Sequence, residues 1–128
     1  MQHVPKRSGF SMVELVFVFV ILSILTLIIV PKIRGAKVKA QRATVVTTLR
    51  NLMTTQEAYW SQYDNYASSV TDAGFETLPG ITVNIIVSTP SGWSAKAVED
   101  VFNTECAVYY GTAAPLAPAT QPHVIGCQ

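Results

Sequence analysis

The chain has 128 residues, a formal net charge of +1 and 49% hydrophobic residues. This length allows one small globular core and excludes an assembly of several domains. The net charge hides an asymmetry, since residues 1–50 carry eight Lys and Arg and one Glu, whereas residues 51–128 carry one Lys and seven Asp and Glu.

A predominantly apolar stretch runs from Phe10 to Val30 and contains one ionisable side chain, Glu14. As a helix, this stretch would measure about 31 Å, which spans the hydrocarbon core of a bilayer. A carboxylate inside hydrocarbon is costly unless it is paired. Glu14 is therefore expected to have a cationic partner; the simpler alternative is that it reaches up to the lipid headgroups.

Ordinary membrane-targeting segments explain this stretch less well. A secretory signal peptide has a shorter apolar region followed by a small-x-small cleavage site, whereas this stretch continues into Pro31 and Lys32. A lipoprotein anchor needs a cysteine directly after the apolar residues, and the first cysteine is Cys106. A plain single-pass anchor explains neither Glu14 nor the short basic leader before Phe10.

Residues 6–15, which read KRSGFSMVEL, resemble the processing site of type IV pilins and of the pseudopilins of type II secretion. The resemblance covers about the first 35 residues. It implies that a prepilin peptidase cuts between Gly9 and Phe10 and that Phe10 is then N-methylated. It also implies that Glu14 of one subunit neutralises the new α-amine of its neighbour during assembly. Burying both charges is tolerable only if they meet.

The same resemblance implies a single-pass prepilin in the bacterial inner membrane, with its C-terminal domain in the periplasm, and later an extracellular pilus or a periplasmic pseudopilus. The implied partners are further copies of the chain in a helical filament, the prepilin peptidase, an inner-membrane assembly platform and other minor pilins. Neither a cofactor nor nucleic acid is expected. The flanking charges favour the opposite topology, because five Lys and Arg within 32–42 outnumber Lys6 and Arg7. The leader and the cysteines outweigh them.

Pro31 is expected to kink or locally open the helix, because it lacks a backbone N–H and its ring clashes with the preceding turn. Beyond it, small and apolar residues recur at spacings of three and four up to about Tyr63, which predicts an amphipathic helix. The predicted stripe comprises Ala36, Ala40, Ala43, Val46, Leu49, Met53, Gln56, Trp60 and Tyr63. Its alanines are expected to face neighbouring subunits, and its larger side chains to face a sheet.

Turn-forming residues dominate 64–79, and three strand candidates follow at Ile81–Ser88, Trp93–Val98 and Glu105–Tyr110. The short connections favour an antiparallel meander. The predicted fold is α+β and pilin-like: a long N-terminal transmembrane and amphipathic helix packed on a small antiparallel sheet of about three strands. The expected parts are a cleaved leader at 1–9, a transmembrane and assembly helix at 10–30, an amphipathic helix at 31–66 and a globular domain at 67–128.

Cys106 and Cys127 are the only cysteines. A bridge between them would fasten the proline-rich tail after Gly111, by about 3 kcal/mol of loop-closure entropy, if the compartment is oxidising. Two buried free thiols are the alternative. A cysteine pair near the C-terminus is more typical of pilins than of pseudopilins.

Catalysis finds little support in the sequence. His123 would be the only histidine after cleavage, and no phosphate loop, CxxC or HExxH motif occurs. We therefore expect no metal site and no enzyme, but a structural subunit that polymerises through its N-terminal helix. The alternatives are a pseudopilin of a type II secretion system and a membrane-anchored binding domain that does not polymerise.

Overall fold

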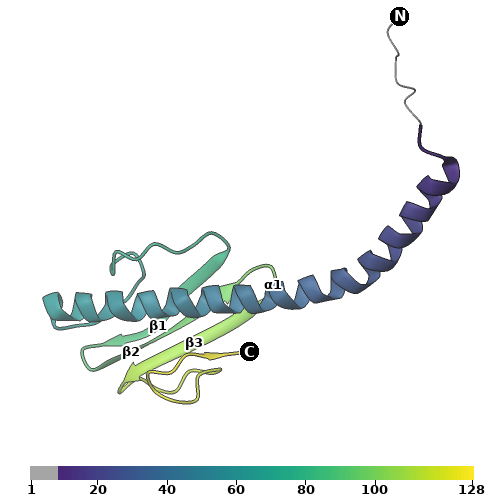
Figure 1. Cartoon of the computed structure of the whole chain (residues 1–128). Helices are drawn as coiled ribbons and strands as arrows, with labels where there is room; N and C mark the ends of the chain where they lie inside the picture. The colour runs from purple at the N-terminus through teal and green to yellow at the C-terminus, as the bar shows by residue number, and fades with distance from the viewer. Residues whose placement is uncertain (1–8) are drawn as a thin grey trace, which may run out of the picture. The chain divides into compact units, whose positions relative to one another are not determined.

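A computed structural model describes residues 9–128, except for the side chain of Pro31. Of the expected leader, only Gly9 falls within the described residues. One helix, α1 (Met12–Tyr63), precedes an antiparallel sheet whose strands are β1 (Ile81–Thr89), β2 (Gly92–Glu99), β3 (Thr104–Gly111) and β4 (Gly126–Cys127), in that spatial order (Figure 1). The predicted α+β, pilin-like fold is confirmed, with one short strand more than predicted.

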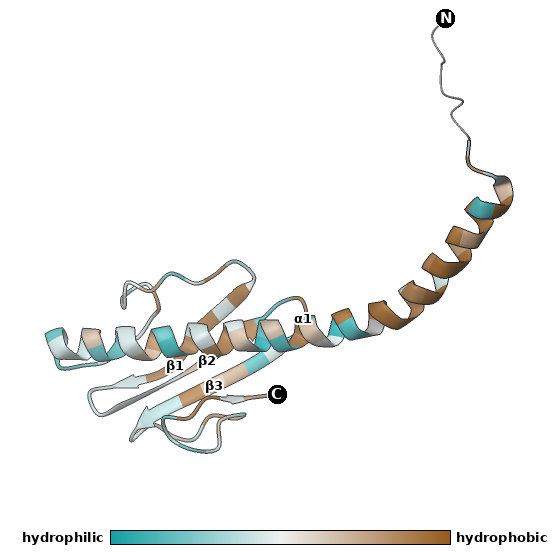
Figure 2. Ribbon diagram, viewed as in Figure 1, coloured by the Kyte–Doolittle hydropathy of each residue, from teal (hydrophilic) through white to brown (hydrophobic). Residues whose placement is uncertain are grey.

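Two compact units divide the chain, one ending at Ala36 and the other running from Lys37 to Gln128. The helix α1 passes from the first unit into the second, and its hydropathy changes along its length (Figure 2). Within the described residues, it is the one helix that is long and apolar enough to cross a membrane by length and composition. The first unit is therefore a candidate membrane span, and the second contains the globular core.

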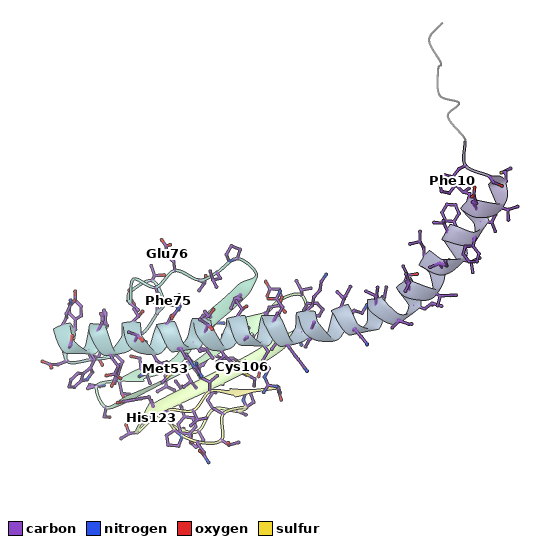
Figure 3. All side chains as sticks on the ribbon, in the orientation of Figure 1. Phe10, Met53, Phe75, Glu76, Cys106 and His123 are labelled. Atoms are coloured by element: carbon purple, nitrogen blue, oxygen red, sulfur yellow. A yellow bond between two sulfur atoms is a disulfide. The ribbon has the colours of Figure 1, made fainter. Side chains whose placement is uncertain are left out.

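The globular core lies between the second part of α1 and one face of the sheet. Val45, Leu49 and Leu52 of the helix are fully buried in it, and Met53 packs at its margin on the sheet side (Figure 3). Because side chains alternate along a strand, every second residue of the central strands faces the helix. These residues are Trp93, Ala95 and Ala97 of β2 and Cys106 and Val108 of β3.

The tail after β3 covers part of the opposite face of the sheet. Ala107 and Tyr109 of β3 pack there against Ala119, with Leu116 beside them. The tail returns as β4, which pairs Cys127 with Cys106 and Gly126 with Ala107. A Cβ on Gly126 would lie 2.3 Å from the carbonyl oxygen of Pro118, so the close approach requires glycine. The tail predicted as irregular thus ends in a two-residue strand, too short for an alternating pattern to reveal.

The predicted helical stripe is wrong at its C-terminal end. Trp60 and Tyr63 are 40% and 62% exposed, because the sheet lies against a face of α1 that is rotated from the predicted one. The buried face consists of Val45, Thr48, Leu49, Leu52 and Gln56. Trp60 instead lies beside the β1–β2 turn, where its indole N–H donates to the carbonyl oxygen of Pro90 at 3.0 Å.

A buried glutamine fastens the connection between helix and sheet. The Gln56 side chain donates to the carbonyl oxygen of Ala67 at 3.1 Å and accepts from the N–H of Ala67 at 2.8 Å. Tyr66 and Phe75 of the same connection pack on the core. Residues 64–79, predicted as a loop, contain turns and no strand, and they contribute to the core through these contacts.

Candidate functional site

The start of α1 carries the residues for which the sequence predicts processing and assembly. Gly9, Phe10 and Ser11 precede the helix, and Phe10 is exposed at its entrance (Figure 3). The N–H of Leu15 donates to the carbonyl oxygen of Ser11 at 3.1 Å, which closes the first helical turn. The Gly9–Phe10 bond therefore lies outside the helical hydrogen-bond ladder, where a peptidase could reach it.

Glu14 closes this end of the helix from inside the first turn. Its Oε2 accepts the backbone N–H of Ser11 at 2.8 Å. A glutamate three residues after a serine that begins a helix is the acceptor half of a capping box, which satisfies one of the N–H groups that a helix start leaves free. Its negative charge is also favourable at the positive end of the helix dipole. The structure thus gives Glu14 a local role besides the predicted intersubunit one.

Phe10, Val13, Glu14, Phe17 and Val18 line one shallow depression on the first unit, of about 340 Å³. Four of these five residues are apolar, and all are exposed. The carboxylate therefore lies at the border of an apolar surface, and a carboxylate with one N–H bound still has acceptor capacity for a cation.

Two hydroxyl groups in the middle of the apolar stretch are satisfied within the helix. The hydroxyl of Ser23 donates to the carbonyl oxygen of Phe19 at 2.7 Å, and that of Thr26 lies 2.8 Å from the carbonyl oxygen of Ser23. Backbone and hydroxyl groups that bond within one helix are the arrangement that hydrocarbon tolerates. α1 is helical through Pro31, so no local opening is present, and the kink at Pro31 stays a prediction.

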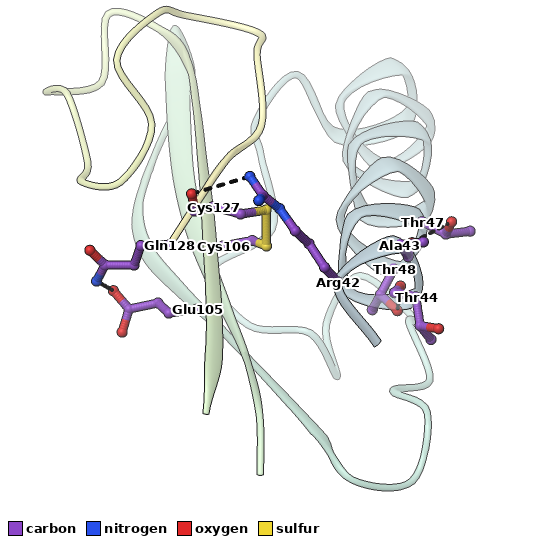
Figure 4. Close-up of a disulfide and its surroundings, with 9 residues drawn as sticks. All are labelled: Arg42, Ala43, Thr44, Thr47, Thr48, Glu105, Cys106, Cys127 and Gln128. Atoms are coloured by element: carbon purple, nitrogen blue, oxygen red, sulfur yellow. Dashed lines mark hydrogen bonds between the residues drawn. A yellow bond between two sulfur atoms is a disulfide. The ribbon is translucent and has the colours of Figure 1, made fainter. Parts of the chain in front are cut away.

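The second unit begins with basic residues that are exposed along α1. Arg42 reaches across to the end of the chain, where one of its guanidinium nitrogens donates to the carbonyl oxygen of Cys127 at 3.4 Å (Figure 4). Ala36, Ala40 and Ala43 are exposed as well. The alanines expected to face neighbouring subunits are therefore exposed on the helix surface.

The predicted disulfide between Cys106 and Cys127 is present, with the two Cα atoms 4.1 Å apart in directly paired positions of β3 and β4 (Figure 4). Cys106 belongs to the core between helix and sheet. The bridge therefore joins the last residues of the chain to the centre of the fold. Among residues 9–128, no group of His, Cys, Asp or Glu side chains is arranged to hold a metal ion.

His123 is exposed, and its ring stacks on that of Tyr110 at 4.1 Å between centroids. Tyr110 also contacts Tyr66 edge-on. Burial, followed by the nearby negative charge of Glu57, raises the pKa of Tyr66 to about 12. This cluster of rings packs the tail and the loop on the core.

One functional feature was missed by the sequence analysis. Ser11-Met12-Val13-Glu14 is an S-x-x-E sequence directly before an apolar helix, and this pattern alone signals a capping box. Glu14 was interpreted through its charge only.

Comparisons with known proteins agree with this arrangement. Residues 4–30 match the family profile described as the prokaryotic N-terminal methylation motif. The chain is 28% identical over 88 residues to the type IV major pilin protein PilA of Myxococcus xanthus, which covers 69% of this chain and 40% of that protein. It is 36% identical over 78 residues to the type II secretion system core protein G of Vibrio cholerae and 31% identical over 78 residues to that of Escherichia coli.

The two protein G matches each cover 61% of this chain and 52% of the relative. The chain thus spans about half the length of these relatives or less. The predicted resemblance to type IV pilins and pseudopilins is confirmed by the motif and by these similarities.

Proposed function

We propose that this chain, which carries the N-terminal motif and the fold of the type IV pilin and pseudopilin family, is a structural subunit of a type IV pilus-like filament. One observation carries the proposal: every side chain described from Phe10 to Val30 is exposed, and nearly all are large and apolar. A surface of this size needs a partner. A bilayer would cover it in the newly made subunit, and the helices of other subunits would cover it in the filament.

Maturation would begin at the accessible bond between Gly9 and Phe10. Hydrolysis by a prepilin peptidase would create an α-amine on Phe10, and an α-amine has a pKa of about 8, so it is largely cationic at neutral pH. N-methylation would keep this charge. The mature subunit would then carry one cation and one carboxylate, that of Glu14, at the start of a helix surrounded by lipid.

Assembly would follow from the cost of burying these two charges separately. An unpaired charge in a medium of low dielectric costs several kcal/mol, and the pair is tolerable when the partners meet. The Ser11 N–H already holds one oxygen of Glu14, which fixes the carboxylate beside the depression lined by Phe10 and Phe17. The ammonium of a neighbouring subunit would dock on the remaining acceptor capacity of that carboxylate.

Two substitutions of Glu14 separate its charge from its capping role. Glu14→Gln keeps an oxygen that can accept the Ser11 N–H but removes the charge, whereas Glu14→Ala removes both. Both variants are expected to insert into the membrane and to yield few or no filaments, measured by electron microscopy and immunoblotting of sheared surface material. Wild-type filament levels in Glu14→Gln would contradict the proposal, because capping alone would then suffice.

The pseudopilin of a type II secretion system is the second candidate, favoured by the similarity to protein G from two bacteria. A pseudopilin would form a short periplasmic filament that serves export. Surface filaments in cells with the gene and none in cells without it would favour the pilus. Unchanged surface material, together with loss of an exported protein, would favour the pseudopilin.

In either case the proposed partners are the same: further copies of the chain, the prepilin peptidase, an inner-membrane assembly platform and minor pilins. The proposed site before assembly is the inner membrane, with the globular domain in the periplasm. The disulfide supports this side of the membrane, because structural disulfides persist in oxidising compartments such as the periplasm.

The basic residues after the apolar stretch favour the opposite orientation. Protease digestion of cells whose outer membrane has been opened separates the two orientations. A periplasmic globular domain is expected to be cut under these conditions, while a cytoplasmic marker protein stays intact. A globular domain that is cut only after the inner membrane is lysed would contradict the proposed orientation.

A further inference from the structure

We propose that the turn between β2 and β3, residues 100–103, is a second membrane contact, which rests in the headgroup region of an anionic bilayer before the subunit leaves the membrane. This inference rests on the membrane anchoring within the proposed function, but not on filament formation. The turn is defined here as the β2–β3 tip.

The tip presents apolar side chains where a turn ordinarily has polar ones. Val101 is 73% exposed and Phe102 is 39% exposed, although Gly, Pro, Asn, Asp and Ser dominate turns of this kind. Together with Lys37, Ala40 and Gln41 of α1, these two residues line an open depression of about 440 Å³. The tip and this part of the helix therefore form one surface within the second unit.

The backbone of the tip is held in place by its own strand. The buried carboxylate of Glu99 accepts the N–H of Val101 at 3.1 Å and that of Phe102 at 2.8 Å. The N–H of Asp100 donates to the carbonyl oxygen of Gly80 at 3.1 Å, which fastens the tip to the start of β1. The two apolar side chains are thus presented by a fixed turn, not by a loop that could fold them inward.

Chain length limits the distance between the tip and the membrane surface. Lys37, which lines the same depression as Val101 and Phe102, follows the last residue of the apolar stretch, Val30, by seven positions. Seven residues measure about 10 Å as a helix and about 25 Å when fully extended. In either conformation, Lys37 lies within about 25 Å of the bilayer interface that Val30 marks, so the tip beside it can reach that interface.

The charges around the tip suit an anionic surface. Five Lys and Arg lie within 32–42, and the sequence has no acidic residue from 32 to 50. Of the acids near the tip, Glu99 is buried and Glu105 pairs with Lys96 at 2.8 Å, which leaves Asp100 as the exposed one. Basic residues beside a membrane span are attracted to anionic lipids, whereas a second copy presenting the same end would bring like charges together.

A fluorescent label at the tip tests the contact directly. The full chain with Val101→Cys is labelled with an environment-sensitive thiol dye without reductant, so that the native disulfide keeps Cys106 and Cys127 unreactive. It is then diluted into vesicles of phosphatidylcholine and phosphatidylglycerol that contain lipids spin-labelled at the headgroup. Gln62→Cys, on the exposed last turn of α1, is the matched control, 25 residues beyond Lys37.

The label at 101 is expected to shift to the blue and to be quenched by the spin-labelled lipid, while the label at 62 stays unquenched. Adding Phe102→Ser to Val101→Cys, with the disulfide intact, is expected to remove most of the quenching. Replacing phosphatidylglycerol by phosphatidylcholine is expected to weaken it. Each of these losses supports the contact.

Equal, unquenched emission at 101 and 62 in all vesicles would overturn the proposal. A blue shift at 101 that grows with protein density and that the spin-labelled lipid does not quench would also overturn it, because another copy of the chain would then cover the tip. Quenching at 101 in a protein that never forms filaments in cells would support the contact and count against the filament proposal alone.

Discussion

Two polar side chains, Glu14 and Gln56, satisfy backbone groups next to the apolar surfaces of this chain. Glu14 satisfies the N–H of Ser11 at the helix start and leaves acceptor capacity for a cation. In the globular unit, Gln56 has a comparable role. Its side-chain nitrogen and oxygen both form hydrogen bonds with the backbone of Ala67. Each residue satisfies backbone groups that lie beside apolar side chains and would otherwise lack a hydrogen-bond partner.

Gln56→Leu is expected to lower the free energy of unfolding by about 2–4 kcal/mol. The leucine keeps much of the buried volume, but the N–H and the carbonyl of Ala67 both lose their partner, and each unsatisfied buried group costs about 1–3 kcal/mol. Denaturant unfolding of the full chain in detergent micelles, followed by tryptophan fluorescence, measures the change. The exposed Gln62→Leu is the control, expected within about 0.5 kcal/mol of wild type. Equal effects of the two substitutions would contradict this role of Gln56.

Tyr66 makes the globular unit sensitive to alkaline pH. Its pKa rises from 10.0 to about 12 in the folded chain, first because of burial and then because of the charge of Glu57. A raised folded pKa means that the stability it contributes is fully present below pH 10 and is lost as the pH rises towards 12. Wild type is therefore expected to lose more stability than Tyr66→Phe over this interval.

The difference in tyrosinate absorbance between wild type and Tyr66→Phe gives the titration of Tyr66 alone. Glu57→Gln removes the negative charge and the charged acceptor of the Tyr66 hydroxyl, so it is expected to lower the pKa of Tyr66. A titration of Tyr66 that is unchanged in Glu57→Gln would contradict the role of Glu57 and leave burial and the neighbouring Tyr110 as the causes of the raised pKa.

Among the elements, the short strand β4 depends most on a covalent link. It has two residues, and one of them, Cys127, is bridged to Cys106 of β3. The preceding tail packs Ala119 and Leu116 on the outer face of β3. The disulfide thus holds the tail in place, because a strand of two residues forms few backbone hydrogen bonds of its own.

Reducing the disulfide, or replacing both cysteines by alanine, is expected to destabilise the globular unit by about 3 kcal/mol through the entropy of the released loop. Thermal unfolding of oxidised and reduced protein in micelles measures the difference. Gln128→Ala, which removes a 3.4 Å contact with Glu105 beyond the bridge, is the control and should unfold like wild type. Equal unfolding of the oxidised and reduced forms would show that packing of the tail suffices without the bridge.

The elements also show what the sequence could and could not predict. Three strands, the end of the helix at Tyr63 and the disulfide were predicted, because alternation, turn residues and a lone cysteine pair are local or countable signals. The buried face of α1 was misjudged at Trp60, because the sheet packs on a helix face that is rotated from the predicted stripe. The cover that Ala119 and Leu116 form on Tyr109 depends on contacts distant in sequence and left no periodic signal.

At the scale of the whole molecule, the chain combines an exposed apolar helix with a globular unit that buries its apolar side chains. Up to Val30 its helix exposes apolar side chains that no other described part of the chain covers, while the unit from Lys37 onward closes a core of its own. The sequence marks Phe10 and Glu14 as a candidate site because both lie in a short motif that matches a known family profile. The β2–β3 tip could not be predicted, since its exposure depends on how Glu99 holds the turn.

The N-terminus of the mature protein tests the central claim most directly. Intact mass and N-terminal peptide analysis of protein purified from cells are expected to give a chain that begins at N-methylated Phe10. Gly9→Val is expected to leave the uncut precursor; a Cβ on Gly9 would meet no atom of the described chain within 4 Å, so the block would arise at the peptidase. A mature chain that begins at any other residue, or normal cutting of Gly9→Val, would contradict the account.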